Sequence, residues 1–147
     1  MKEIVGNLWD YYNVGFVVCI TTNGFVKNNG EAVMGRGCAF EATQRFPDIR
    51  KQLGEHILRH GNTPVWLNIG LVTFPVKHSW WEEADLRLIQ ESARWLFEAA
   101  QSLPQRQFVL PRPGCGNGRL CWADVKPCLE FLPDNVLVID FPKSGAR

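Results

Sequence analysis

Short apolar runs alternate with amphipathic stretches along the chain, which is the pattern of a layered α/β fold. The run 16–21 is β-branched and continuous, as expected for a strand that is buried on both faces. Further runs of this kind lie at 65–69, 71–74, 107–110 and 135–139, and Gly70 joins the first two of them. Another strand is expected before Gly6. The sequence therefore predicts a sheet built from short, separated strands.

Helices are predicted between these strands. One apolar stripe has spacings of three and four residues, and its members are Leu86, Ile89, Ala93, Leu96 and Ala100. Ile49 begins a second such stripe with Leu53 and Ile57. Shorter helices are expected over 37–46 and about 122–131. The alternation of strands and helices predicts a three-layer α/β/α sandwich around a mixed, largely parallel sheet.

Composition narrows the class of protein. With 147 residues, of which 46% are hydrophobic and 21% charged, the chain fits one globular domain, placed at 1–147. Its formal net charge of +1 lacks the basic excess that a broad nucleic-acid or membrane surface needs. The five cysteines are irregularly spaced, which argues against a disulfide framework or a metal site and favours a cytoplasmic protein. No segment has the apolar length of a signal peptide or membrane span. A monomer is the favoured oligomeric state.

Two glycine-rich segments carry the candidate chemistry. The first, 33–40, is predicted to lead from a strand into a helix. Glycine lets a backbone approach a ligand closely, and the unpaired N–H groups at a helix start attract anions. The second, 110–120, also follows a strand, and its three glycines suit a nest of backbone amides. Each segment taken alone is equally compatible with a tight turn that needs glycine only for its backbone geometry.

The two segments are expected at the carboxyl ends of strands, where ligands collect in open α/β sheets. They can therefore face each other across a cleft and hold a diphosphate from both sides. Neither segment matches a P-loop, and neither has the full G-x-G-x-x-G context of a dinucleotide fold.

Four short motifs together point to one family. They are Gly6-Asn7-Leu8, Thr22-Asn23-Gly24, Met34-Gly35-Arg36-Gly37-Cys38-Ala39, and Pro113-Gly114-Cys115-Gly116-Asn117-Gly118 followed by Leu120 and Trp122. In these motifs and their order the chain resembles the macro-domain family over nearly its whole length. It most resembles the branch that holds the bacterial DNA ADP-ribosyl glycohydrolase DarG and the terminal ADP-ribose protein glycohydrolases. The resemblance implies that the protein binds ADP-ribose and removes it from DNA or protein, without a metal or redox cofactor.

The resemblance also implies which residues contact the ligand. Asn7 would lie near the adenine and Asn23 near the distal ribose, while the two glycine-rich segments would hold the diphosphate. The full implied set is Asn7, Leu8, Thr22, Asn23, Met34, Gly35, Arg36, Gly37, Cys38, Ala39, Pro113, Gly114, Cys115, Gly116, Asn117, Gly118 and Arg119. As residue types alone, Asn7 and Asn23 are equally well explained as turn formers.

Lys77 is the candidate catalytic residue. It lies in Phe74-Pro75-Val76-Lys77-His78-Ser79-Trp80, where the resembling branch has a catalytic lysine after its middle strand. A lysine near ribose C1″ can attack that carbon or its open-chain aldehyde once the amine is deprotonated. Burial beside Trp80 or Trp81 would lower the pKa of the amine, and these tryptophans can also stack on a base or cover the cleft. The alternative is a lysine that only neutralises phosphate.

Two positions depart from the patterns of that branch. Gly118 stands where the terminal glycohydrolases have an acid, and Cys121 replaces the aspartate of a Leu-Asp-Trp motif. Asp124 is the nearest carboxylate, but at a helix start it can serve simply as a cap. No general acid or base is therefore assigned.

Three alternative functions remain open on the sequence. The missing carboxylates favour a non-catalytic reader of ADP-ribose. A phosphatase that acts on ADP-ribose 1″-phosphate is the second alternative, because some macro domains have that activity. A nucleic-acid-binding module is the third, and the near-neutral charge disfavours strong binding of unmodified nucleic acid.

Overall fold

The computed structural model describes residues 1–142, and within that range six strands form one sheet in the order β1-β6-β5-β2-β4-β3. The strands are β1 Lys2–Val5, β2 Val17–Asn23, β3 Trp66–Asn68, β4 Leu71–Lys77, β5 Phe108–Pro111 and β6 Val136–Asp140. Neighbouring strands are parallel except β3 and β4, which pair antiparallel across a turn at Gly70. The predicted mixed, largely parallel sheet is confirmed.

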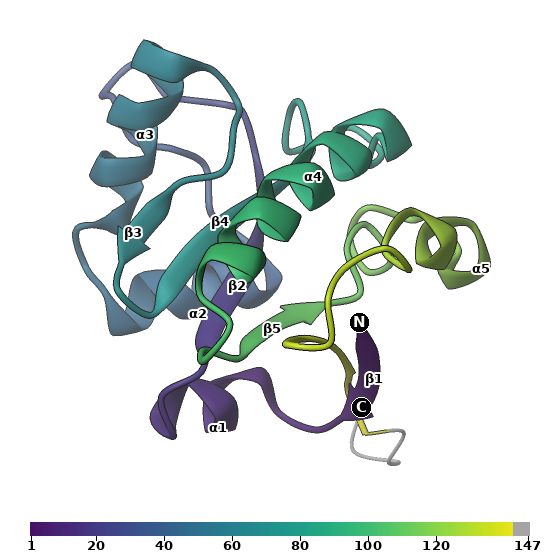
Figure 1. Cartoon of the computed structure of the whole chain (residues 1–147). Coiled ribbons are helices and arrows are strands. Elements are labelled where there is room, and N and C mark those ends of the chain that lie inside the picture. Colours follow the sequence, from purple (N-terminus) through teal and green to yellow (C-terminus); the bar gives the residue numbers. More distant parts are fainter. Residues whose placement is uncertain (143–147) are drawn as a thin grey trace.

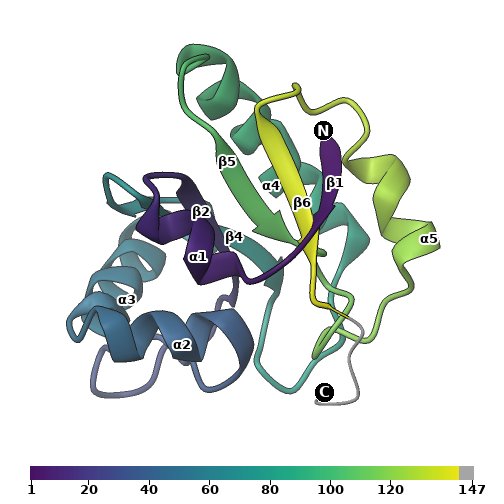
Figure 2. The ribbon, with the colours of Figure 1, turned by 90° about the horizontal axis from the view of Figure 1, so that it is seen from below.

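Helices cover both faces of this sheet (Figure 1, Figure 2). On one face lie α1 Leu8–Asn13, α2 Gly37–Arg45 and α3 Ile49–His60; on the other lie α4 Leu86–Ser102, α5 Trp122–Val125 and the 3₁₀ turn η1 Lys126–Cys128. Strand β2 separates two apolar clusters, because Val17 and Cys19 face the α4 side while Val18 and Ile20 face the α1–α3 side. This alternation explains the continuous apolar run and confirms the three-layer sandwich.

The predicted helical stripes are the buried faces of α3 and α4. Leu86 is partly buried and the other four members of the α4 stripe are fully buried against the sheet. Asp85 caps this helix, since its side chain accepts a hydrogen bond from the Arg87 N–H at 2.9 Å. In α3, Ile49 and Leu53 are fully buried. No helix within residues 1–142 is both long and apolar enough to span a membrane.

Two predictions about local structure are wrong. The helix predicted over 122–131 ends at Val125 and continues only as the 3₁₀ turn, because Pro127 has no N–H for an α-helical hydrogen bond. The segment that leads into the first glycine loop is not a strand either. Only an isolated bridge between Val26 and Ala32 marks it as extended.

The loop 24–33 is instead anchored on α3. The N–H of Ala32 donates to the Arg50 carbonyl oxygen at 2.9 Å, and the Gly30 carbonyl oxygen lies against Gly54 where a Cβ atom would clash. Gly54 therefore allows loop and helix to pack backbone against backbone. This contact places the start of the first glycine loop beside the end of β2.

The parallel pairing brings the carboxyl ends of β2, β4, β5 and β6 to one edge of the sheet. Asn23, Lys77, Pro111 and Asp140 end these four strands. Open α/β sheets bind ligands at such an edge.

Candidate functional site

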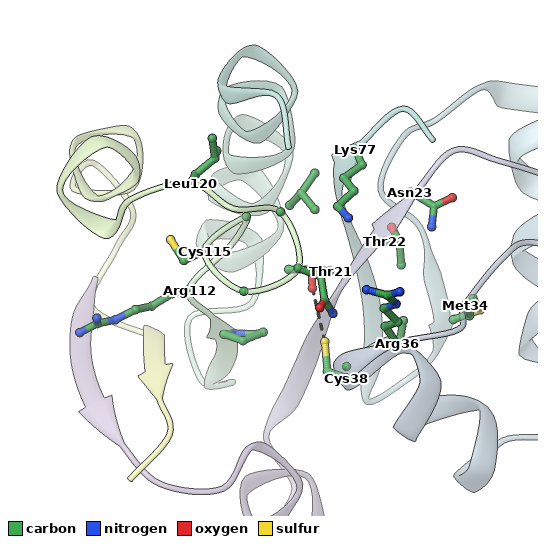
Figure 3. Close-up of a pocket in the computed structure, with 18 of the residues that line it drawn as sticks. Thr21, Thr22, Asn23, Met34, Arg36, Cys38, Lys77, Arg112, Cys115 and Leu120 are labelled. Atoms are coloured by element: carbon green, nitrogen blue, oxygen red, sulfur yellow. Dashed lines mark hydrogen bonds between the residues drawn. The ribbon is translucent and has the colours of Figure 1, made fainter. Parts of the chain in front are cut away.

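A cavity of about 830 Å³ opens at this edge of the sheet. Its walls come from the ends of β2, β4, β5 and β6, the first glycine loop with the start of α2, and the second glycine loop (Figure 3). A cavity of this volume accommodates a nucleotide-sized ligand.

Most of the residues implied as ligand contacts line this cavity. They are Thr22, Asn23, Met34, Gly35, Arg36, Gly37, Cys38, Ala39, Gly114, Cys115, Gly116, Asn117 and Gly118, and the candidate catalytic Lys77 joins them.

Four of the implied residues lie outside the described lining: Asn7, Leu8, Pro113 and Arg119. Asn7 caps α1, since its side chain accepts from the N–H of the residue two positions on at 2.9 Å, and Leu8 is buried in the core. Pro113 is also buried, whereas Arg119 is exposed. The motif residues at the start of the chain thus have clear structural roles of their own.

The two glycine loops meet over the cavity. A Cβ atom built on Gly37 would lie 3.5 Å from Nδ2 of Asn117. Gly37 and Gly114 have φ angles of 57° and 77°, in the left-handed region that favours glycine. Glycine at these two positions therefore serves the turn geometry of each loop.

Unpaired backbone amides border the cavity from both loops. The second loop closes on itself, because the N–H of Leu120 donates to the Gly114 carbonyl oxygen at 2.8 Å. The N–H groups of Gly116, Asn117 and Gly118 donate to no acceptor within the described chain. The first turn of α2 adds N–H groups for which a helix provides no acceptor. Such an arrangement is suited to binding an anion.

Thr22 carries an unsatisfied polar atom in the cavity wall. Its side chain is the one in the described range with a buried oxygen or nitrogen that has no hydrogen-bond partner, although the residue is only 5% exposed. Figure 3 places Thr22 between Lys77 and Asn23. Buried hydroxyls almost always find a partner, so we expect this one to bond to the ligand.

Lys77 lies in a locally positive part of the cavity. Burial lowers the pKa of its amine, and the positive charges of Arg119 and Arg36 lower it further. Figure 3 shows the side chains of Lys77 and Arg36 entering the same part of the cavity. No carboxylate forms an ion pair with these three cations within residues 1–142. The effect of burial on Lys77 was predicted from the sequence, whereas the effect of the two arginines was not.

The structure accounts for the missing acid in the second loop. A Cβ atom on Gly118 would lie 2.6 Å from the Gly114 carbonyl oxygen and 2.7 Å from the Ala84 Cβ atom. No acidic side chain fits there without rearrangement of the loop. Cys121 and Asp124 are exposed and lie outside the described lining.

Carboxylates reach the cavity from positions that the sequence analysis did not select. Glu41 and Asp140 line it. Glu41 accepts a hydrogen bond from the Trp9 indole at 3.0 Å, whereas Asp140 pairs with Arg112 at 3.5 Å. The place of Asp140 at the end of the last parallel strand was a signal that could have identified it. Glu41, within α2, offered no comparable signal.

The chain was compared with known proteins in sequence and in structure. No family model matches the sequence. The chain is 29% identical to a DNA ADP-ribosyl glycohydrolase of Thermus aquaticus over 113 residues, which cover 69% of this chain and 31% of the relative. The macrodomain of Thermus aquaticus DarG is similar in structure with a TM-score of 0.74 and 26% identity, over 96% of this chain and 97% of that one. The chain has the fold of a macro domain and is similar in sequence and structure to DarG macro domains.

A more distant structure supports the fold of this macro domain. It is Thermosipho africanus DarTG in complex with ADP-ribose, with a TM-score of 0.76 and 18% identity over 97% of this chain and 42% of that one. The macro domain spans less than half the length of the curated relatives that it matches.

Thr22→Val tests the unsatisfied hydroxyl. The variant keeps the shape of the side chain and removes the hydroxyl, so we expect affinity for ADP-ribose to fall roughly fivefold to tenfold. Thermal unfolding should show no loss of stability, because no protein hydrogen bond is removed. Isothermal titration calorimetry gives the affinity.

Thr43→Val is the matched control. Its hydroxyl donates to the Phe40 carbonyl oxygen at 2.6 Å and lies outside the described lining, so this variant should lose stability and keep its affinity. Unchanged affinity in Thr22→Val would contradict the assigned contact.

Proposed function

We propose that this macro domain binds ADP-ribose and hydrolyses it from an ADP-ribosylated macromolecule. The observation that carries the proposal is that one cavity holds a lysine with a lowered pKa and two sets of backbone amides that have no acceptor within residues 1–142. The names of the similar proteins favour DNA over protein as the modified macromolecule.

The diphosphate is assigned to the two glycine loops. Amides of 35–39 and 114–118 would bond its oxygens from opposite sides, and Arg36 would add a charge-assisted contact. Because backbone N–H groups make these contacts, most positions in the two loops need no particular side chain. This arrangement is therefore consistent with the small residues that fill both loops.

The adenine and the distal ribose are assigned to the two ends of the cavity, according to which side chains there can still contact a ligand. The side chain of Asn7 is engaged in capping α1, which favours the wall formed by Arg112, Trp122 and Asp140 for the adenine. The guanidinium carbon of Arg112 lies 4.7 Å from the centre of the Trp122 ring. Asn23 lies at the other end of the cavity, and we assign the distal ribose to its neighbourhood. Its amide also donates to the Val33 carbonyl oxygen at 3.0 Å, so the same residue holds the loop in place.

Lys77 would act as the nucleophile. The neutral amine attacks C1″ of the distal ribose, a bond forms between Nζ and C1″, and the bond from C1″ to the macromolecule breaks. The released group leaves with the electron pair and takes up a proton, while Nζ loses one. Water then cleaves the bond between C1″ and Nζ, which returns the amine and releases ADP-ribose. Glu41 and Asp140 are the carboxylates in the described lining that can take part in proton transfer.

A reader without catalytic activity is the second candidate. The observation that favours it is the lack of space for an acidic side chain at Gly118. Such a reader would use the same amides to bind ADP-ribose and would leave the modified macromolecule intact.

Lys77→Ala separates these two candidates. Incubation with ADP-ribosylated DNA and ADP-ribosylated protein, followed by chromatography of released ADP-ribose, should show turnover by the natural protein. We expect the variant to lose at least about a hundredfold in kcat, because it lacks the nucleophile, and to retain ADP-ribose affinity within a few-fold. Binding without any release by the natural protein would establish the reader instead.

Arg119→Gln tests the electrostatic activation of Lys77. Because the neutral amine reacts, kcat/KM should rise with pH as Lys77 loses its proton. Removing the positive charge of Arg119 raises the Lys77 pKa, so the rise should move to higher pH. Arg119→Lys keeps the charge and should keep the profile of the natural protein. A profile that is identical in all three proteins would rule out this activation.

A further inference from the structure

Two exposed tryptophans and a half-buried phenylalanine form a cluster beside the proposed reaction centre. Trp80 and Trp81 are 51% and 54% exposed, although tryptophan is usually well buried. Their ring centres lie 5.4 Å apart at an interplanar angle of 86°, and Phe25 lies 5.4 Å from Trp81. We call Phe25, Trp80 and Trp81 the aromatic platform.

The aromatic platform is held in place from both of its loops. The N–H of Gly24 donates to the Lys77 carbonyl oxygen at 3.1 Å, and the N–H of Phe25 donates to the Asn23 side chain at 2.9 Å. On the other loop, His78 bonds Asp85, the cap of α4, at 2.7 Å. The platform therefore presents its rings without first having to become ordered, which favours binding.

The aromatic platform is continuous with the cavity. Trp80 lines the cavity, and its carbonyl oxygen accepts a hydrogen bond from Lys77 Nζ at 3.4 Å. Trp81 lies outside the described lining. A group joined to C1″ at Lys77 would therefore leave the cavity next to these rings.

Charge around the aromatic platform limits what can bind. Arg119 forms no ion pair within residues 1–142 and acts electrostatically on Lys77, so its charge suits a phosphate beside the modified nucleotide. Glu82 and Glu83 follow Trp81 and are exposed, which disfavours a long phosphate track over the rings. Stacking with a base is therefore the expected contact on the platform itself.

We propose that the aromatic platform binds a nucleobase of single-stranded DNA that flanks the ADP-ribosylated nucleotide. Exposed aromatic faces bind unstacked bases, which single strands offer and duplexes do not, and such stacking adds about 1–3 kcal/mol per base. The inference rests on the proposed function. It adds a contact outside the cavity, in which Trp81 recognises the flanking base without contacting ADP-ribose.

The experiment compares three ligands in a Lys77→Ala background, which prevents turnover. They are free ADP-ribose, a short single-stranded oligonucleotide with one ADP-ribosylated base, and a peptide with one ADP-ribosylated side chain. We expect the oligonucleotide to bind about tenfold more tightly than ADP-ribose. Trp81→Ala should remove this gain and leave the affinity for ADP-ribose within about twofold.

Two further variants serve as controls. Trp81→Phe keeps an aromatic face and should retain most of the gain. Phe131→Ala removes a ring that is 48% exposed and packs on Phe97, outside the described lining, and it should change neither affinity.

Four results would overturn the inference. The first is equal affinity for the oligonucleotide and ADP-ribose, and the second is a higher affinity for the oligonucleotide that persists in Trp81→Ala. The third is an equal loss of affinity for both ligands in Trp81→Ala. The fourth is a higher affinity for the peptide that also depends on Trp81. A protein that binds ADP-ribose without the oligonucleotide gain would refute the platform alone. A folded protein that does not bind ADP-ribose would refute the proposed function itself, and the platform with it.

Discussion

The site depends on the close approach of the two glycine loops, where the Gly37 backbone lies against the Asn117 side chain. Parallel strands bring the two loops to the same edge of the sheet, and glycines with positive φ let each loop turn there. A loop with its own backbone hydrogen bonds satisfied would have nothing to offer an anion. Here the second loop closes through Gly114 and Leu120, and three N–H groups between them have no acceptor within residues 1–142. The fold thus holds these donors in position before any ligand arrives.

The same edge explains how binding and chemistry share one cavity. Strand β4 ends at Lys77 beside the amides, so the charges that attract a diphosphate also act on the lysine amine. Arg36 and Arg119 disfavour a third positive charge and thereby favour the neutral amine. The cost of such a cluster is repulsion in the free protein, which an anionic ligand relieves.

The periodicity of hydrophobic residues predicted the strands and helices whose burial depends on neighbouring positions in the sequence. The continuous run around Ile20 and the Leu96 stripe gave the buried strand and the α4 helix, because burial follows directly from periodicity. The helix predicted over 122–131 is short, because Pro127 has no N–H to continue it. The loop 24–33 could not be predicted, because its shape is fixed by contacts with Gly54 and Arg50 that are distant in the sequence.

In the candidate site, too, some residues were predicted from the sequence and others are brought together only by the fold. Both glycine loops and Lys77 were found from short motifs, whereas Glu41 and Asp140 were missed. A carboxylate on a helix or at a strand end looks ordinary in the sequence, and only the packing of α2 and β6 brings these two to the cavity. The pKa of Lys77 likewise depends on two arginines from separate loops, whose proximity is a property of the fold.

In the proposed complex, main-chain amides of the two glycine loops bind the diphosphate. Two-dimensional NMR of the ¹⁵N-labelled protein tests it directly, during titration with ADP-ribose and, separately, with adenosine. The account predicts that the amide signals of Gly37, Ala39, Gly116, Asn117 and Gly118 move strongly with ADP-ribose and little with adenosine. If ADP-ribose bound while these signals stayed in place, the diphosphate would lie elsewhere and the account would be wrong.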